Sequence, residues 1–313
     1  MIVGGVFDFL PRNTQKRIRC HRVALVAIIL AVLAPCASTL ADDGVKRDSI
    51  PKLASVDFGW VSPRDDFLPP LSGPGPVFFD PAHPYVPNGG RGDGVQYGGS
   101  QPTHRVADLS NPILRPWAVE QMKKANDAVL AGKVPFTARE SCWPAGVPGF
   151  AVFSHIKLVY FIQTAKEVLM IQDDWQVRHI YLNVPHTAHP MPSWYGESIG
   201  HYETGDTLVV DTIGLNNKTF IDNYRTPHTT QLHVVERYKL DGDGLTLRGS
   251  YFVEDPGAFN MPWSARQDYH RVDVGKNLPD QPIPMIEGVC AENGSQFNYD
   301  VAAIPQAGKN ADF

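Results

Sequence analysis

Short segments with a strand-like pattern of apolar and polar residues follow one another between Leu158 and Val274. Alternate residues of a strand lie on one face, so apolar residues at every second position predict half-buried strands. Tight polar turns separate the segments; in Asp241-Gly242-Asp243-Gly244, for example, Gly and Asp accommodate the backbone of a hairpin. The pattern predicts eight strands, at 158–163, 167–172, 176–182, 198–203, 207–213, 231–240, 245–254 and 265–274.

We expect these strands to form an antiparallel up-and-down meander that closes into a lipocalin-like barrel, because closure removes unpaired edges. Two long loops, at 183–195 and 214–230, interrupt the meander. One helix precedes it, with Pro116 suited to its first turn and Gly132 at its end. An apolar stripe predicts that this helix docks on the barrel or plugs it; the stripe consists of Ala118, Met122, Ala125 and Val129.

The N-terminal segment 1–41 has the pattern of a secretory signal. Basic residues up to Arg22 precede an uncharged apolar run at 23–34, and small residues allow cleavage after Ala41. The run is too short to span a bilayer as a helix. We therefore expect a periplasmic or secreted protein without stable membrane association, while retention of the segment as an anchor and lipidation of Cys36 stay open as alternatives.

These patterns divide the chain into four parts. They are the signal (1–41), an extended arm rich in Pro and Gly (42–110), the helical segment (111–135) and the barrel domain with a C-terminal tail (136–313). Aromatic residues recur along the arm, which indicates that it packs on a surface. That surface is either the barrel or another subunit, so a homo-oligomer formed through the arm is one expectation.

The net charge limits the classes of partner that we expect, and the cysteine content predicts a disulfide. Cleavage after Ala41 removes five basic residues and one acidic residue, which leaves 23 basic against 32 acidic residues and a formal charge of −9. Nucleic acids and anionic membrane surfaces require clustered Lys and Arg, so neither is expected as a partner. Two cysteines, Cys142 and Cys290, remain, and in an oxidising compartment they are expected to form a disulfide. A reactive or metal-binding thiol is the alternative.

Histidine enrichment is the strongest indication of a site. Six of the ten histidines after residue 41 lie between His179 and His233. Imidazole titrates near neutral pH, so a His next to a carboxylate can act as an acid or base. The candidates for such catalysis are His201, His228 and His233, with Asp211 or Glu236 as partner.

Asp211 and Glu236 interrupt apolar strands. Each is a buried carboxylate that needs partners if its face is the barrel interior, and an ordinary solvated charge if its face is the outside. Both readings stay open at this stage. Four residues of the loops and their flanks are candidates for binding a ligand: His186, Trp194, Tyr195 and Trp263.

Other chemistries are weakly supported or disfavoured. His and carboxylate side chains suit zinc, iron or copper, but the chain has neither an HxH nor an HExxH pattern, so no metal site is assigned. A GxSxG motif, a phosphate loop and a dinucleotide-binding fingerprint are also missing from the sequence, which disfavours serine hydrolases and Rossmann enzymes. The sequence does not identify a cofactor.

Several motifs together resemble a family of exported bacterial proteins to which no activity is assigned. The resemblance covers about residues 105–300, and it implies export but no catalytic residues. The motifs are Leu114-Arg115-Pro116-Trp117-Ala118, Cys142-Trp143-Pro144, Gly146-Val147-Pro148, Trp194-Tyr195-Gly196-Glu197-Ser198, the run from Gly205 to Thr212, His228, the run from Leu232 to Arg237, and Asp255-Pro256.

Three functional hypotheses follow from these observations. The first is an exported barrel that binds a small, partly apolar molecule in its interior, rimmed by His and aromatic residues. The second is an enzyme that uses a His–carboxylate pair in the same pocket as an isomerase, cyclase or hydrolase, with or without a metal. The third is a structural or assembly protein that docks through its aromatic arm.

Overall fold

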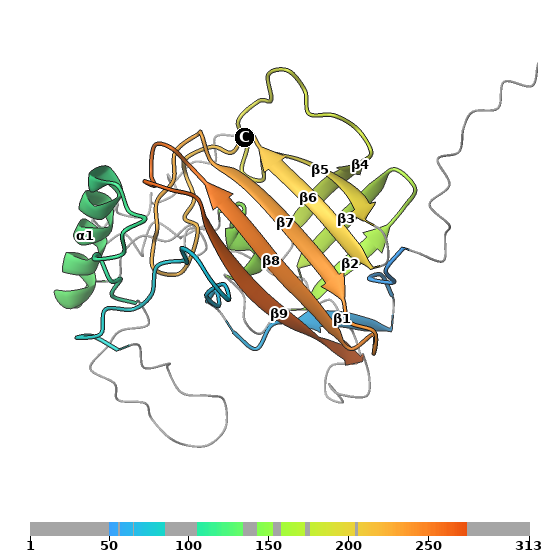
Figure 1. Ribbon diagram of the computed structural model, residues 1–313, viewed down its shortest axis with the longest axis horizontal. Coiled ribbons are helices and arrows are strands. Elements are labelled where there is room, and N and C mark those ends of the chain that lie inside the picture. The colour runs from blue at the N-terminus through green and yellow to red at the C-terminus, as the bar shows by residue number, and fades with distance from the viewer. Residues whose placement is uncertain are drawn as a thin grey trace, which may run out of the picture. The chain divides into compact units, whose positions relative to one another are not determined.

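Nine strands form a closed barrel in the computed structural model (Figure 1). The structure describes residues 50–55, 57–64, 66–84, 105–133, 143–152, 158–172, 176–203 and 206–273. The mainly β fold and the barrel are confirmed, and eight of the strands match the predicted segments to within two residues. The strands are β1 (Phe58–Val61), β2 (Val159–Gln163), β3 (Glu167–Gln172), β4 (Val177–Leu182), β5 (Glu197–Glu203), β6 (Thr207–Ile213), β7 (His233–Leu240), β8 (Thr246–Glu254) and β9 (Trp263–Asp273).

The strand order follows the sequence, and one seam departs from the predicted antiparallel meander. β4 and β5 are parallel, and they pair only through Tyr181 with Ile199 and Leu182 with Gly200. Parallel neighbours cannot be joined by a tight turn, because the chain must return to the end at which the first strand began. The loop between Leu182 and Glu197 makes this return, which explains its length.

β1 is the strand that the sequence pattern did not predict. It lies within the Pro- and Gly-rich arm and closes the barrel by pairing with β9 from Phe58–Asp273 to Val61–His270, and with β2 at Trp60–Val159. The described part of the arm then follows β9, where Leu68 and Arg266 exchange two backbone hydrogen bonds of 2.9 Å. This described part of the arm therefore packs on the barrel of its own chain.

Large side chains occupy much of the barrel interior. The strands β3, β4, β7 and β8 alternate buried and exposed residues, as a sheet with one buried face requires. The largest fully buried side chains include Trp60, Arg178, Tyr238, Tyr251 and Trp263. Such filling is typical of small barrels, whose interiors are just wide enough for side chains.

The α-helix α1 (Pro116–Leu130) is docked beside the loops and does not plug the barrel (Figure 1). Its buried residues are Ala118, Met122, Asn126 and Val129, so Asn126 takes the place in the stripe that Ala125 was expected to fill. The Asn126 side chain accepts from the amide of Ala107 and donates to its carbonyl, both at 2.9 Å. A short 3-10 helix covers Gly149–Ala151.

Some predictions lie outside the described residues. They concern the signal segment 1–41, the cysteines Cys142 and Cys290, and the tail after Asp273. Within the part of the chain that the structure describes, no helix is long and apolar enough to cross a membrane.

Candidate functional site

The crossover loop between β4 and β5 brings His186 over the outer face of the barrel. His186 contacts Glu197 at the start of β5 and Asp211 on β6. Asp211 points outward, because its neighbours Val210 and Thr212 are fully buried inside. Because β4 and β5 are parallel, the loop between them must run back to the starting end of the barrel. On this path it places the imidazole of His186 beside the carboxylate of Asp211 on β6.

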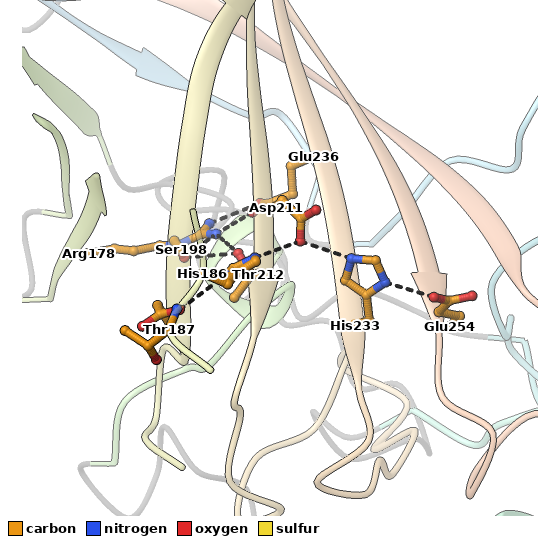
Figure 2. A network of polar contacts seen from close by, with 10 residues as sticks. Arg178, His186, Thr187, Ser198, Asp211, Thr212, His233, Glu236 and Glu254 are labelled. Atoms are coloured by element: carbon orange, nitrogen blue, oxygen red, sulfur yellow. Dashed lines mark hydrogen bonds and ion pairs between the residues drawn. The ribbon is translucent and has the colours of Figure 1, made fainter. Parts of the chain in front are cut away.

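Five side chains form a continuous row in which carboxylates and imidazoles alternate (Figure 2). Oδ1 of Asp211 lies 3.1 Å from Nε2 of His186 and 2.9 Å from Nε2 of His233. The other ring nitrogens, both Nδ1, lie 2.9 Å from Oε1 of Glu197 and 2.7 Å from Oε1 of Glu254. We call these residues the outer cluster: Glu197, His186, Asp211, His233 and Glu254.

The strand register explains how His233 reaches its two partners. His233 pairs directly with Glu254 across β7 and β8, while Asp211 pairs with Val235. His233 is two residues from Val235 and therefore lies diagonal to Asp211 on the same face. Long side chains in diagonal positions of a sheet are within reach of one another.

The surroundings of His233 favour its charged form. A carboxylate oxygen only accepts hydrogen bonds, so an imidazole with a carboxylate at each nitrogen donates from both and carries a proton on each. Burial on its own lowers the pKa of His233, but the hydrogen bond to Glu254 and the charge of Asp211 outweigh burial and raise it. Burial would raise the pKa of Glu197, but hydrogen bonds from the Thr187 amide and His186 lower it.

The outer cluster is partly open to solvent. The side chains of His186 and Glu197 are 19% and 20% exposed, whereas those of Asp211 and Glu254 are 39% and 40% exposed. Both contacts of Asp211 use Oδ1, so Oδ2 of this half-exposed carboxylate has no partner among the described residues. Asp211 thus has one carboxylate oxygen fixed by two imidazoles and a second oxygen without a partner among the described residues, on a side chain that is partly exposed.

The structure shows no metal-binding geometry in the residues that it describes. Within them, no group of three or more His, Cys, Asp or Glu side chains is arranged to hold a metal ion. In the outer cluster, both Nε2 atoms bond to one and the same oxygen of Asp211.

Glu236 belongs to a second network inside the barrel. Its carboxylate pairs with Arg178 from β4, with Nη1 at 3.0 Å from Oε1 and Nη2 against Oε2, and it accepts from the hydroxyl of Tyr238 at 2.8 Å. Arg178 also donates to Ser198 and Thr212. Burial lowers the pKa of Arg178, but Glu236 outweighs burial and raises it. We call Arg178, Ser198, Thr212, Glu236 and Tyr238 the inner network.

The other two candidate histidines lie apart from both networks. His228 is buried in the loop between β6 and β7, where Nδ1 donates to the carbonyl of Thr229 at 3.1 Å. Its Nε2 therefore accepts from the hydroxyl of Thr219 at 2.9 Å, and burial lowers the pKa of His228, which keeps it neutral. His201 is exposed on β5 opposite Val209.

The predicted aromatic ligand-binding residues have different surroundings. Trp263 is 1% exposed and packs in the core against Phe259, with ring centroids 5.8 Å apart. Tyr195 donates to Gln176 at 2.6 Å. Trp194 lies at the surface between Trp143, 5.2 Å away, and the ammonium group of Lys218, 5.6 Å from its ring centre. Of the predicted ligand-binding residues, His186 alone is part of the outer cluster.

Sequence reasoning selected Asp211, His233 and His186 but missed Glu197, Glu254 and Arg178. Hairpin register could have found Glu254. Counting outward from the turn at 241–245, where Leu240 pairs with Leu247, places Glu254 opposite His233. Arg178 gave no comparable signal, because its partners come from three strands that no tight turn relates to β4.

No protein-family model, curated protein or solved structure matches the chain. The candidate site therefore depends on geometry alone.

Proposed function

We propose that this protein is an enzyme that exchanges a proton with a small, partly apolar substrate at Asp211. The observation that carries the proposal is the position of Asp211 between two imidazoles, each fixed at its other nitrogen by a further carboxylate. Side chains that hold a reactive group in one orientation are what acid–base catalysis requires.

The geometry suggests a role for each member of the outer cluster. Oδ2 of Asp211 faces the substrate and acts as the base. The Nε2 atoms of His186 and His233 hold Oδ1, and His233 supplies positive charge next to the site, where negative charge develops in the transition state. Glu197 and Glu254 orient the imidazoles as second partners. Isomerisation, cyclisation and hydrolysis can each be catalysed by such a base.

The surface around Asp211 supports an apolar substrate body. One row across four strands contains Ile199, Asp211, Val235 and Phe252, each paired with the next. Ile199 and Val235 are half-buried, and Phe252 is 40% exposed. Asp211 is thus a single carboxylate in an apolar row, so a substrate can place its apolar part on the row and its reacting group at the carboxylate. This location is the outer face of the barrel and not its interior.

A protein that only binds such a molecule is the second candidate, favoured by the same apolar row. The two candidates differ in what happens to the bound molecule. We would incubate the protein in D2O with small ketones, esters and epoxides that carry phenyl or alkyl groups, and follow each by proton NMR. This detects isomerisation, cyclisation, hydrolysis and exchange of carbon-bound hydrogen in one experiment.

The decisive variants are Asp211→Asn and His233→Gln, with His201→Gln as the matched control on the same outer face. We expect Asp211→Asn to lower kcat/KM for any substrate found by about 100-fold or more, the usual contribution of a positioned base. His201→Gln should leave turnover unchanged. Turnover that survives in Asp211→Asn would disprove the proposal, and saturable binding without turnover would favour the second candidate.

A further inference from the structure

Of the strand pairings that position the outer cluster, the one between β4 and β5 is the shortest. We call it the β4–β5 seam. β6 and β7 pair from Thr207–Lys239 to Thr212–Val234, and this ladder relates Asp211 to His233. The β4–β5 seam has the pairs Tyr181–Ile199 and Leu182–Gly200, continued by a hydrogen bond of 2.8 Å from the Asn183 amide to the Gly200 carbonyl. His186 lies on the loop that leaves β4, so its position relative to Asp211 depends on this short seam and on the Thr187 amide, which donates to Glu197 at 2.8 Å.

Arg178 spans the seam from the inside. Its Nε and Nη2 lie 3.3 and 3.1 Å from Oγ of Ser198 on β5, and Nη2 lies 2.9 Å from Oγ1 of Thr212 on β6. Ser198 and Thr212 also bond to each other at 2.9 Å. With Glu236 on β7, one fully buried guanidinium joins four strands. A planar group with five fixed donors suits this task, and a lysine does not.

Each inner partner on β5 and β6 adjoins a member of the outer cluster. Ser198 follows Glu197 and Thr212 follows Asp211, and consecutive residues of a strand point to opposite faces. Figure 2 shows Ser198 and Thr212 of the inner network close to Asp211 and His186 of the outer cluster. Fixing Ser198 and Thr212 from inside therefore fixes the backbone that carries Glu197 and Asp211 outside.

We propose that Arg178 is a positioning residue that holds the His186 half of the outer cluster against the Asp211 half. Without this tie, β4 and the crossover loop move away from β5, and His186 separates from Asp211 and Glu197. His233 stays in place, because the ladders on both sides of β7 are continuous. The importance of this separation for catalysis rests on the proposed function, but the separation itself can be measured without a substrate.

The test is the rate at which diethyl pyrocarbonate modifies each histidine, read by mass spectrometry of peptides at neutral pH. The reagent attacks an unbonded ring nitrogen, so the contacts of His186 protect it. The variants are Arg178→Lys and Ser198→Ala, and Ser198→Thr restores the hydroxyl group. Asn126→Ala is the control, since it removes buried hydrogen bonds that lie on α1 and away from the seam.

We expect Arg178→Lys and Ser198→Ala to speed modification of His186 at least about fivefold to tenfold, because one lost hydrogen bond has an effect of this size on local opening and each variant loses more than one. His233 should change by less than about twofold, and Ser198→Thr should return His186 to the wild-type rate. Equal acceleration of both histidines, as a general loss of stability would give, overturns the proposal, and so does an unchanged rate at His186.

Failure of this inference can be told from failure of the proposed function. If Asp211→Asn abolishes turnover while Ser198→Ala leaves His186 protected from the reagent, the result supports the proposed function and refutes the positioning role of Arg178. If His186 alone becomes reactive but no substrate is ever turned over, Arg178 positions a cluster whose role is not catalytic.

Discussion

The inner network and the outer cluster are built on the same strands and differ in what surrounds them. Thr212 and Asp211 are neighbours on β6, yet Thr212 contacts a buried guanidinium and Asp211 a half-exposed row of imidazoles. Both sets pair cations with carboxylates. The inner set is sealed, with Arg178 and Glu236 at 0% and 1% exposure. The inner ion pairs are therefore part of the core, whereas the outer cluster keeps contact with solvent.

The energetic difference follows from desolvation. Two buried charges are stable together but very costly when one partner is removed, because the other is left without water or a counter-ion. A half-exposed pair keeps contact with water and contributes little to stability. Substitution of equivalent carboxylates in the two networks should therefore give very different results.

The largest expected effect is that of Glu236→Gln, which leaves Arg178 charged and buried. We expect it to lower the free energy of unfolding by about 3–5 kcal/mol, measured by urea denaturation. The matched variant Asp211→Asn should cost less than about 1 kcal/mol. Combining Arg178→Met with Glu236→Leu removes both charges and should recover most of the loss. Equal costs for Glu236→Gln and Asp211→Asn would refute the contrast between the networks.

A smaller effect is expected at Gly196, which leads the crossover loop into β5. Its φ of 64° is one that glycine adopts readily, and an added Cβ would lie 2.4 Å from the carbonyl oxygen of Ile213. We expect Gly196→Ala to cost about 1–3 kcal/mol, through strain and this clash. Gly242→Ala is the control, because a Cβ there meets no atom within 4 Å. A Gly196→Ala variant as stable as Gly242→Ala would show that the loop tolerates another path.

The smallest effects are pH-dependent and have opposite signs at two histidines. The raised pKa of His233 gives stability that is fully present below its unfolded value of 6.5 and is lost as pH rises through the folded value. The lowered pKa of His228 acts in the other direction: below pH 6.5 the unfolded chain gains a proton that the folded protein resists, so stability falls.

Unfolding free energies at a series of pH values separate these contributions. The advantage of wild type over His233→Gln should shrink as pH rises above 6.5, and its advantage over His228→Asn should shrink as pH falls below 6.5. His201→Gln, at an exposed position, serves as the control. The same trend in both variants would contradict the contrast between a paired imidazole and a buried neutral one.

Local pattern was sufficient to predict most of the barrel. Strands β7 and β8 alternate clearly and are joined by a polar turn, so their limits could be placed within two residues. β1 could not be found in this way. It has four residues, of which Phe58, Gly59 and Trp60 are all buried, and it lies among prolines and glycines. Pairing with β9, more than two hundred residues away, makes it a strand, and no local pattern reports such pairing.

Three of the five residues of the outer cluster could be predicted from the sequence, but their arrangement could not. Asp211 attracted notice as a polar group in an apolar strand, and His233 through the enrichment of histidines, but the sequence could not decide whether Asp211 faces the interior or the exterior of the barrel. Residues Asp211 and Glu236 turned out to lie on opposite sides of the sheet. His186 reaches Asp211 only because β4 and β5 are parallel. This pairing is determined by the topology of the whole barrel, and the sequence of the loop does not reveal it.

Closure by β1 also bears on the order in which the barrel forms. The hairpins β5–β6 and β7–β8 need only short loops, whereas β1 must find β9 after most of the chain has been made and ordered. Contacts between residues far apart in sequence form slowly, because ordering the intervening chain costs entropy first. We expect a transient open sheet of eight strands with β2 and β9 as unpaired edges. When β1 pairs with β2 and β9, it covers both edges and prevents them from pairing with other chains.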